Sequence, residues 1–170
     1  GATGPSPRRE PGRKPAGATP PRPASRIPLP VPTPFPLRMT APLRVREIPP
    51  GESLRPFIDL AWKANAGDPC WVPPLRMVVA QLLDRRKHPF HQHAEVAYFL
   101  AERGGEAVGR IAAVENRQYN RYHGDRTGFF GLFECLDDPE GARALVEAAP
   151  ARLRGRGMEG IVGRLYLSTN

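Results

Sequence analysis

The chain has 170 residues, 22 of them proline, and a formal net charge of +8, which is enough length for one domain with a buried core. It contains neither the roughly 18 to 20 consecutive apolar residues of a membrane helix nor the apolar core of a signal peptide, so we expect a soluble cytoplasmic protein with no membrane partner. Seven Lys or Arg against one acid place +6 of the charge before residue 39, so the remainder is close to neutral and does not indicate nucleic-acid binding.

Residues 1–38 differ in composition from the rest of the chain. They hold 12 of the 22 prolines and almost no large apolar residue before Ile27. Such a segment cannot bury enough apolar surface to offset its ordering entropy, so we expect a disordered, basic, proline-rich leader followed by a domain over residues 39–170. The cations of the leader are separated by prolines and alanines without interleaved aromatic residues, which makes nucleic-acid binding the weakest of the functional hypotheses. Met39 opens the domain-like sequence and is a candidate start of the protein.

The first half of the domain predicts one strand and two helices. Leu43–Ile48 has the pattern of a strand, which the Pro-Pro-Gly at 49–51 ends. Ser53 is the predicted N-cap of a helix that runs to about Ala66, and a loop over residues 68–74 follows it. A second helix ends before residue 89, and helical spacing predicts that its buried face consists of Leu75, Val78, Val79, Leu82 and Leu83.

The second half predicts a hairpin, a third sheet strand, a long helix and a last strand. The hairpin strands are 95–102 and 107–114, joined through a Gly-Gly turn, and the third strand is 127–136 after a polar loop at 116–123. Asp138 is the predicted N-cap of the long helix, and Pro150 is expected to kink it or end it early. The buried face of this helix is predicted to hold Ala142, Leu145, Val146, Ala149 and Leu153. A last strand is expected over Ile161–Leu167.

The resulting α/β order, β-α-α-β-β-β-α-β, resembles the front of the GNAT (acyl-CoA N-acyltransferase) fold. Four local runs are similar to a group of uncharacterised bacterial GNAT-like proteins: the segments 67–75, 88–97, 109–113 and 128–135. The resemblance covers about residues 43–170 and implies a mixed sheet. Family enzymes continue with a further helix and strands that carry a tyrosine acid, so the resemblance implies that this domain is incomplete at its C-terminal end.

The resemblance implies a site on the strand over residues 128–136. In the family this strand is splayed from its neighbour, and its free backbone groups hold the pantetheine arm and thioester carbonyl of acetyl-CoA or another acyl-CoA. The residues here that match this role are Phe130, Gly131, Leu132 and Phe133. Glu134 matches the base that deprotonates the amine acceptor, because burial beside Phe133 and Cys135 would raise its pKa. The alternative is that Glu134 points to solvent or pairs with a nearby arginine.

Two further parts of the implied site are less well matched. The family binds the cofactor pyrophosphate at the start of the long helix, where this chain has three acids, Asp137, Asp138 and Glu140, with Gly141 and Arg143 as weak compensation. The polar loop at 116–123 could line an acceptor pocket through Tyr119, Asn120 and Tyr122, or it is a solvated connector.

The remaining reactive side chains do not form a specific motif. His88, His91 and His93 lack the spacing of a zinc site and are expected to make loop hydrogen bonds, so we expect no metal. Cys70 and Cys135 are expected to be buried thiols in a reducing compartment. The leading hypothesis is an N-acyltransferase domain that moves an acyl group from acyl-CoA to an amine. The alternatives are a non-catalytic GNAT-like binding domain and, last, nucleic-acid binding through the leader.

Overall fold

The computed structural model describes Gly1, residues 41–165 and Leu167. The contacts of the chain divide it into Gly1–Pro34 and Phe35–Asn170, and every helix and strand below belongs to the second unit. The predicted leader therefore lies outside the described residues, apart from Gly1. The elements in chain order are β1 (Leu43–Glu47), α1 (Arg55–Ala64), α2 (Arg76–Leu83), the 3-10 helix η2 (Pro89–Gln92), β2 (Ala94–Arg103), β3 (Glu106–Asn116), α3 (Arg117–His123), β4 (Thr127–Cys135), α4 (Pro139–Arg154) and β5 (Gly160–Leu165).

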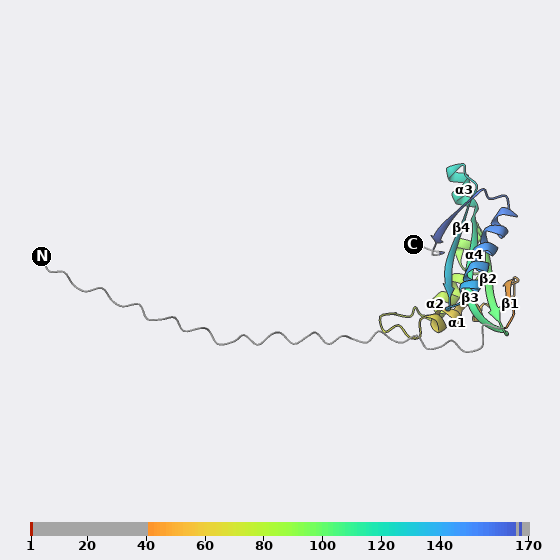
Figure 1. Cartoon of the computed structure of the whole chain (residues 1–170). Helices are drawn as coiled ribbons and strands as arrows, with labels where there is room; N and C mark the ends of the chain where they lie inside the picture. Colours follow the sequence, from red (N-terminus) through yellow and green to blue (C-terminus); the bar gives the residue numbers. More distant parts are fainter. Residues whose placement is uncertain (2–40, 166, 168–170) are drawn as a thin grey trace. The chain divides into compact units, whose positions relative to one another are not determined.

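The strands form one mixed sheet in the order β1-β2-β3-β4-β5, as Figure 1 shows. The first four strands are antiparallel, and β5 lies parallel to β4. Gly104 and Gly105 both have positive φ in the turn between β2 and β3, a backbone that glycine adopts without a steric penalty. The predicted hairpin and the α/β class with a mixed sheet are confirmed.

Each face of the sheet carries its own apolar layer. Because side chains alternate along a strand, Val96, Tyr98 and Leu100 of β2 point to one face, where they pack with buried residues of α1 and α2. Ala97, Phe99 and Ala101 point to the other face and pack with Leu145, Ala149 and Leu153 of α4. The sheet is thus covered by α1 and α2 on one side and by α4 on the other (Figure 1).

One predicted loop is a helix, and one helix has a different buried face. Residues 117–123 form α3, with Asn116 as N-cap and Gly124 as a left-handed C-cap, so the prediction of a polar loop at 116–123 is wrong. The cap residues are the missed signal, because polar residues obscure any apolar period. In α2 only Val79, Leu82 and Leu83 are buried, whereas Leu75 and Val78 are exposed because they turn away from the sheet.

The remaining corrections concern single positions. Leu54, not Ser53, is the N-cap of α1, although Ser53 Oγ still accepts a hydrogen bond from the N–H of Arg55. The helix α4 runs on through Pro150 to Arg154, so of the two predicted effects, a kink or an early end, the early end is wrong. Val146 in the same helix is half exposed, since it faces away from the sheet. Cys70 lies exposed in the loop between α1 and α2 and is not a buried thiol.

The bounds of two elements also shift. Helix α1 ends at Ala64 rather than near Ala66, and β5 begins at Gly160 rather than at Ile161. Trp62 of α1 and Trp71 of the loop that follows it stack edge to face with ring centroids 5.7 Å apart, which anchors the loop. None of the described helices is both long and apolar enough to cross a membrane.

Candidate functional site

The strand β4 carries a bulge at its centre. It pairs with β3 from Val114 opposite Phe129 to Gly109 opposite Cys135, and the register shifts between Arg110 and Ala112. At this point Leu132 has φ of 51°, the only non-glycine residue with positive φ in the described part of the chain. A left-handed leucine costs energy that the flanking ladder must offset, and such bulges re-aim side chains and backbone groups beside functional sites.

The bulge changes which face each β4 side chain meets. Phe129 and Leu132 both pack against the layer of α1 and α2, and Phe130 and Phe133 both pack against the layer of α4. Strict alternation would send two residues three positions apart to opposite faces. The extra residue at the bulge therefore keeps both phenylalanines on the side of α4.

The strands β4 and β5 stay paired only over the first part of β4. The register runs from Thr127 opposite Gly160 to Gly131 opposite Leu165, with a shift after Phe130. A Cβ on Gly163 would overlap the Phe130 ring, so that ring lies directly on the backbone of β5. Within the described residues, positions 132–135 have no pairing with β5. This is the arrangement in which backbone groups of β4 can serve a ligand instead of a ladder.

Glu134 is held by an arginine on the neighbouring strand. Its Oε2 lies 2.9 Å from Nη2 of Arg110, whose side chain is 6% exposed, whereas the Glu134 side chain is 29% exposed. Nη1 of Arg110 also donates to the carbonyl oxygen of Phe57 in α1 at 2.6 Å. The pairing of Glu134 with a nearby arginine, the alternative to a free base, is therefore present, while the Glu134 side chain as a whole is partly exposed.

The acidic start of α4 is tied to a buried arginine. Asp138 caps the helix by accepting the N–H of Gly141 at 2.9 Å, as predicted. Nε of Arg103 donates to Asp138 at 2.5 Å, and Nη2 contacts Glu140. The guanidinium holds the pKa of Asp138 below its ordinary value. The N–H of Gly141 is thus already occupied, and two of the three acids at this turn share one cation.

Cys135 closes the strand on the side of α4. Its Sγ donates to the carbonyl oxygen of Asp138 at 3.5 Å, and burial raises the pKa of the thiol to about 11. A thiol with that pKa is almost fully protonated at neutral pH and is a poor nucleophile. Cys135 therefore contributes packing rather than chemistry.

The three predicted acceptor residues lie on α3 at the start of β4. The Tyr119 ring packs edge to face on Phe129 at 4.9 Å, and Asn120 Oδ1 accepts the N–H of Thr127 at 3.2 Å. Tyr122 is 85% exposed. At about 3.3 Å per residue, the strand from Phe129 to Glu134 spans roughly 16 Å. The structure therefore brings Tyr119 and Asn120 to β4, but at the opposite end from Glu134.

Two of the three histidines, His88 and His91, make side-chain hydrogen bonds to the nearby loop and helix, as expected. His88 Nδ1 accepts the N–H of Phe90 at 3.3 Å, and His91 Nε2 lies 3.3 Å from the carbonyl oxygen of Leu82. Burial lowers the pKa of His91. No group of three His, Cys, Asp or Glu side chains suited to a metal ion occurs among the described residues.

Two curated bacterial proteins are similar to this chain. It is 42% identical over 118 residues to a protein of Caulobacter vibrioides (strain NA1000 / CB15N) named bacterial ceramide synthase, a match covering 69% of this chain and 31% of that protein. It is 33% identical over 117 residues to Protein YghO of Escherichia coli (strain K12), covering 69% of this chain and 30% of that protein. The matched part is thus about a third of the length of either relative. No protein-family model matches the chain.

Solved structures share the arrangement of the sheet and helices at low sequence identity. An aminoglycoside acetyltransferase from an uncultured soil metagenomic sample matches at a TM-score of 0.52 and 16% identity, over 73% of this chain and 78% of that one. A tandem GNAT protein from the clavulanic acid biosynthesis pathway matches at 0.53 and 18%, over 68% and 34%. With its bulged β4 between β3 and a parallel β5, the described part of the chain has the fold of the GNAT acyl-CoA N-acyltransferases.

Proposed function

We propose that this chain is the acyl-CoA-binding part of an N-acyltransferase, which transfers an acyl group from an acyl-CoA thioester to an amine. The observation that carries the proposal is the edge of β4 after the bulge at Leu132, within a GNAT fold, where positions 132–135 have no partner in β5 among the described residues. Backbone N–H groups at this edge are the donors that an acyl-transfer site needs for the oxyanion of its tetrahedral intermediate.

The reaction uses this edge in one direct displacement. The amine nitrogen attacks the thioester carbonyl, whose oxygen takes the negative charge and receives hydrogen bonds from the N–H groups around residues 131–133. The intermediate collapses to the amide and releases the coenzyme A thiolate. The amine loses one proton, and Glu134, whose side chain is partly exposed, accepts it.

The name of one relative supports a long apolar acyl chain and acceptor. A ceramide is an amide between a fatty acid and the amine of a sphingoid base, and the protein named ceramide synthase is 42% identical to this chain. We propose a fatty acyl-CoA and a long-chain amine as the substrates. Phe130 and Phe133, both on the side of α4, would flank the path of the acyl-CoA. Tyr119, Asn120 and Tyr122, at the opposite end of β4 from Glu134, would contact the far end of the long acceptor chain and not its amine.

A non-catalytic binding domain is the second candidate, and the start of α4 favours it. The Asp138 carboxylate occupies the N–H of Gly141, so a pyrophosphate bound there would have to displace that carboxylate. Arg143, exposed on the same helix, is the nearest predicted cation for such a phosphate. A folded chain that neither binds nor turns over acyl-CoA would support this candidate, as a domain for a different ligand.

The test follows the release of coenzyme A. We would incubate the purified chain with acetyl-CoA or palmitoyl-CoA and with sphinganine or a short primary amine, and measure free thiol and amide product. We expect the palmitoyl-CoA and sphinganine pair to react fastest. Glu134→Gln should lower kcat by about 10²- to 10⁴-fold, as loss of a general base does. Glu147→Gln, at an exposed carboxylate of α4, should leave it unchanged.

Hydrogen exchange separates failure of catalysis from failure of binding. Acyl-CoA should slow exchange of the backbone amides at residues 128–136. Protection without product would mean that the chain binds acyl-CoA at β4 without catalysing transfer. If millimolar acyl-CoA neither protects this strand nor raises Tm, the chain does not use β4 for acyl-CoA, the acyltransferase proposal is wrong and the binding domain is supported.

A further inference from the structure

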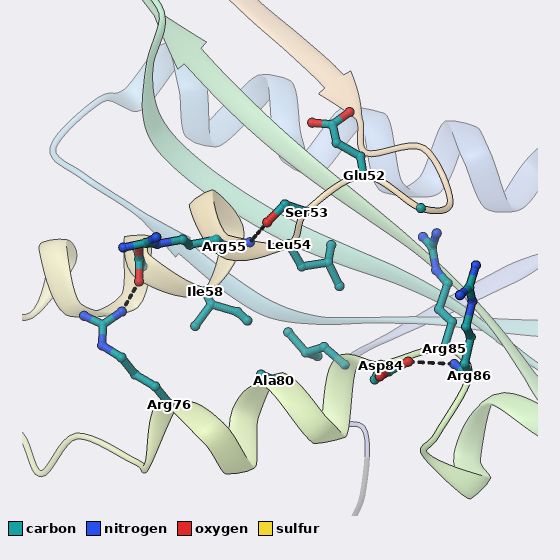
Figure 2. Close-up of a pocket in the computed structure, with 13 residues that line it drawn as sticks. Glu52, Ser53, Leu54, Arg55, Ile58, Arg76, Ala80, Asp84, Arg85 and Arg86 are labelled. Carbon is teal, nitrogen blue, oxygen red and sulfur yellow. Dashed lines mark hydrogen bonds and ion pairs between the residues drawn. The ribbon is translucent and has the colours of Figure 1, made fainter.

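A cavity of about 760 Å³ lies apart from β4, between the start of α1 and the end of α2 (Figure 2). This volume is within the range of roughly 300 to 1,000 Å³ that small-molecule sites occupy. The floor of the cavity is apolar and contains Leu54, Ile58, Ala80 and Leu83. Leu83 and Ile58 belong to the buried layer beneath α1 and α2, so the floor is a rigid part of the core.

One end of the cavity carries two adjacent arginines. Arg85 and Arg86 follow α2 directly, and Figure 2 shows both side chains extending toward the loop that holds Glu52. Nη2 of Arg85 donates to the carbonyl oxygen of Val96 at 3.0 Å, and its Nε is buried without a hydrogen-bond partner. Within the described part of the chain neither guanidinium forms an ion pair with a carboxylate.

The nearby acids do not neutralise these arginines. The carboxylate of Glu52 pairs with Arg46 at 2.8 Å. Asp84 accepts the backbone N–H of Arg86 at 2.9 Å and lies 3.8 Å from Lys87 Nζ. Both carboxylates therefore already interact with other groups. The two guanidinium groups can then donate hydrogen bonds to an anion from outside the protein.

The opposite end of the cavity is also cationic, but its two arginines share a carboxylate. Arg55 and Arg76 both contact the carboxylate of Asp59. Arg76 also lies over the Trp62 ring, with Cζ 4.1 Å from the ring centroid, which fixes its direction. Among the described residues of this cavity, the arginines without a carboxylate partner are therefore Arg85 and Arg86.

We propose that this cavity binds an amphiphile with an anionic head group, a carboxylate or a phosphate monoester, on an aliphatic chain. The head group meets Arg85 and Arg86, and the chain covers the apolar floor. This site is independent of acyl transfer at β4, so a failure of the proposed function would not contradict it. A cationic amphiphile with the same chain is rejected because it brings a like charge to the two arginines.

The ligand test uses three amphiphiles with one chain length. Isothermal titration of the full chain with dodecanoate, dodecyl phosphate and dodecylamine, each below its micelle concentration, should show saturable binding of one anion per chain and no binding of the amine. Equal binding of all three, or of none, would overturn the proposal.

Vesicles of phosphatidylglycerol test the membrane as the source of the anion. Binding to vesicles without binding of either monomeric anion would assign the arginines to a membrane surface and overturn the cavity site.

Two pairs of variants locate the site. Arg86→Gln should weaken dodecyl phosphate by about tenfold or more, because a charge-assisted hydrogen bond is lost. Arg154→Gln, at an exposed arginine of α4 on the other side of the sheet, should not change the affinity.

Ala80→Trp fills the cavity from an exposed helix position and should abolish binding, whereas Gln81→Trp at the adjacent exposed position should not. Equal effects of the two tryptophans, with folding unchanged by circular dichroism, would place the ligand elsewhere.

Discussion

Arg103 is the charged side chain on which the start of α4 depends most. It is 7% exposed and reaches Asp138 and Glu140, while its Nη1 donates to the carbonyl oxygen of Ala41 at 2.9 Å. Removing one partner of a buried ion pair leaves the other charge buried without compensation. Arg103→Gln should therefore lower Tm by more than about 10 °C in a thermal melt followed by circular dichroism.

The control for this variant is an exposed ion pair of the same kind. Arg126 Nη1 lies 2.9 Å from Glu159 Oε1, and both side chains are mostly exposed. Arg126→Gln should move Tm by no more than about 2 °C, since exposed pairs contribute little. A similar small shift for both variants would mean that Arg103 does not hold the start of α4.

The ion pair between Arg103 and Asp138 predicts how the stability of the chain depends on pH. The hydrogen bond from Arg103 lowers the pKa of Asp138 in the folded chain. The stabilisation from the ionised carboxylate is then fully present above the ordinary aspartate pKa of about 3.9, and it is lost as the pH falls through the lower folded pKa. The difference in free energy of unfolding between the parent chain and Asp138→Asn should therefore be constant near neutrality and shrink below about pH 4. Urea denaturation from pH 7 to pH 2 measures it, and a pH-independent difference would contradict the assignment.

Local sequence patterns predict some of these residue roles, but not the contacts between residues far apart in the chain. The cap at Asp138 is predictable because its signal is local, an aspartate followed by proline at the first helical position. Its partner Arg103 lies 35 residues away, and no local pattern joins the two. The strand position of Glu134 follows from the sequence, but its ion pair with Arg110 depends on the β3–β4 register, which the bulge at Leu132 shifts.

At the scale of elements, α4 lies so close to the sheet that a Cβ at two glycine positions of the strands would press on leucine side chains of the helix. A Cβ on Gly128 would lie 2.8 Å and 2.9 Å from the two Cδ atoms of Leu153, and one on Gly109 would lie 2.7 Å from Leu145 Cδ1. Gly128→Ala should cost about 1 to 3 kcal/mol in the free energy of unfolding, as overpacking of a filled core does. Urea denaturation measures the change.

Gly67→Ala is the matched control for this prediction. A Cβ added to Gly67 would meet no heavy atom within 4 Å, and the φ of Gly67 is not positive. We expect the control to change the free energy of unfolding by less than about 0.5 kcal/mol. An equal loss in both variants would show that backbone freedom, rather than contact with α4, sets the cost.

The elements that are predicted correctly have strong periodic or turn signals. The β2–β3 hairpin follows from two apolar runs around Gly104 and Gly105, and α4 follows from its start signal and its apolar period. Helix α3 has no apolar face, so only its caps mark it. Helix propensity does not predict that α4 continues through Pro150, since proline removes a backbone hydrogen bond. Packing of Ala149 and Leu153 on the sheet offsets that loss.

At the scale of the whole molecule, charged side chains of α4 connect three strands. Arg152 contacts Glu47 of β1 and Glu95 of β2, each at 3.1 Å. Arg156, just after the helix, contacts Glu95 at 2.7 Å and Glu115 of β3 at 3.0 Å. These pairs are partly exposed, so each contributes little alone, but together they fix the direction of the helix across the sheet. The charge of the domain is thus largely balanced within itself.

The unbalanced charge of the chain is in the leader, and this gives a prediction for the entire molecule. Residues 1–38 carry +6 of the net +8, and the contacts of the chain separate residues 1–34 from 35–170. Deleting residues 1–38 should leave Tm within about 2 °C of the full chain, because the core layers lie wholly in the described domain. The deletion should also lower the salt concentration for elution from heparin, because fewer cations meet the anionic matrix. A large fall in Tm would show that residues 1–38 contribute to the stability of the domain. Unchanged elution from heparin would place the anion-binding surface on the domain, with Arg85 and Arg86 as its first candidates.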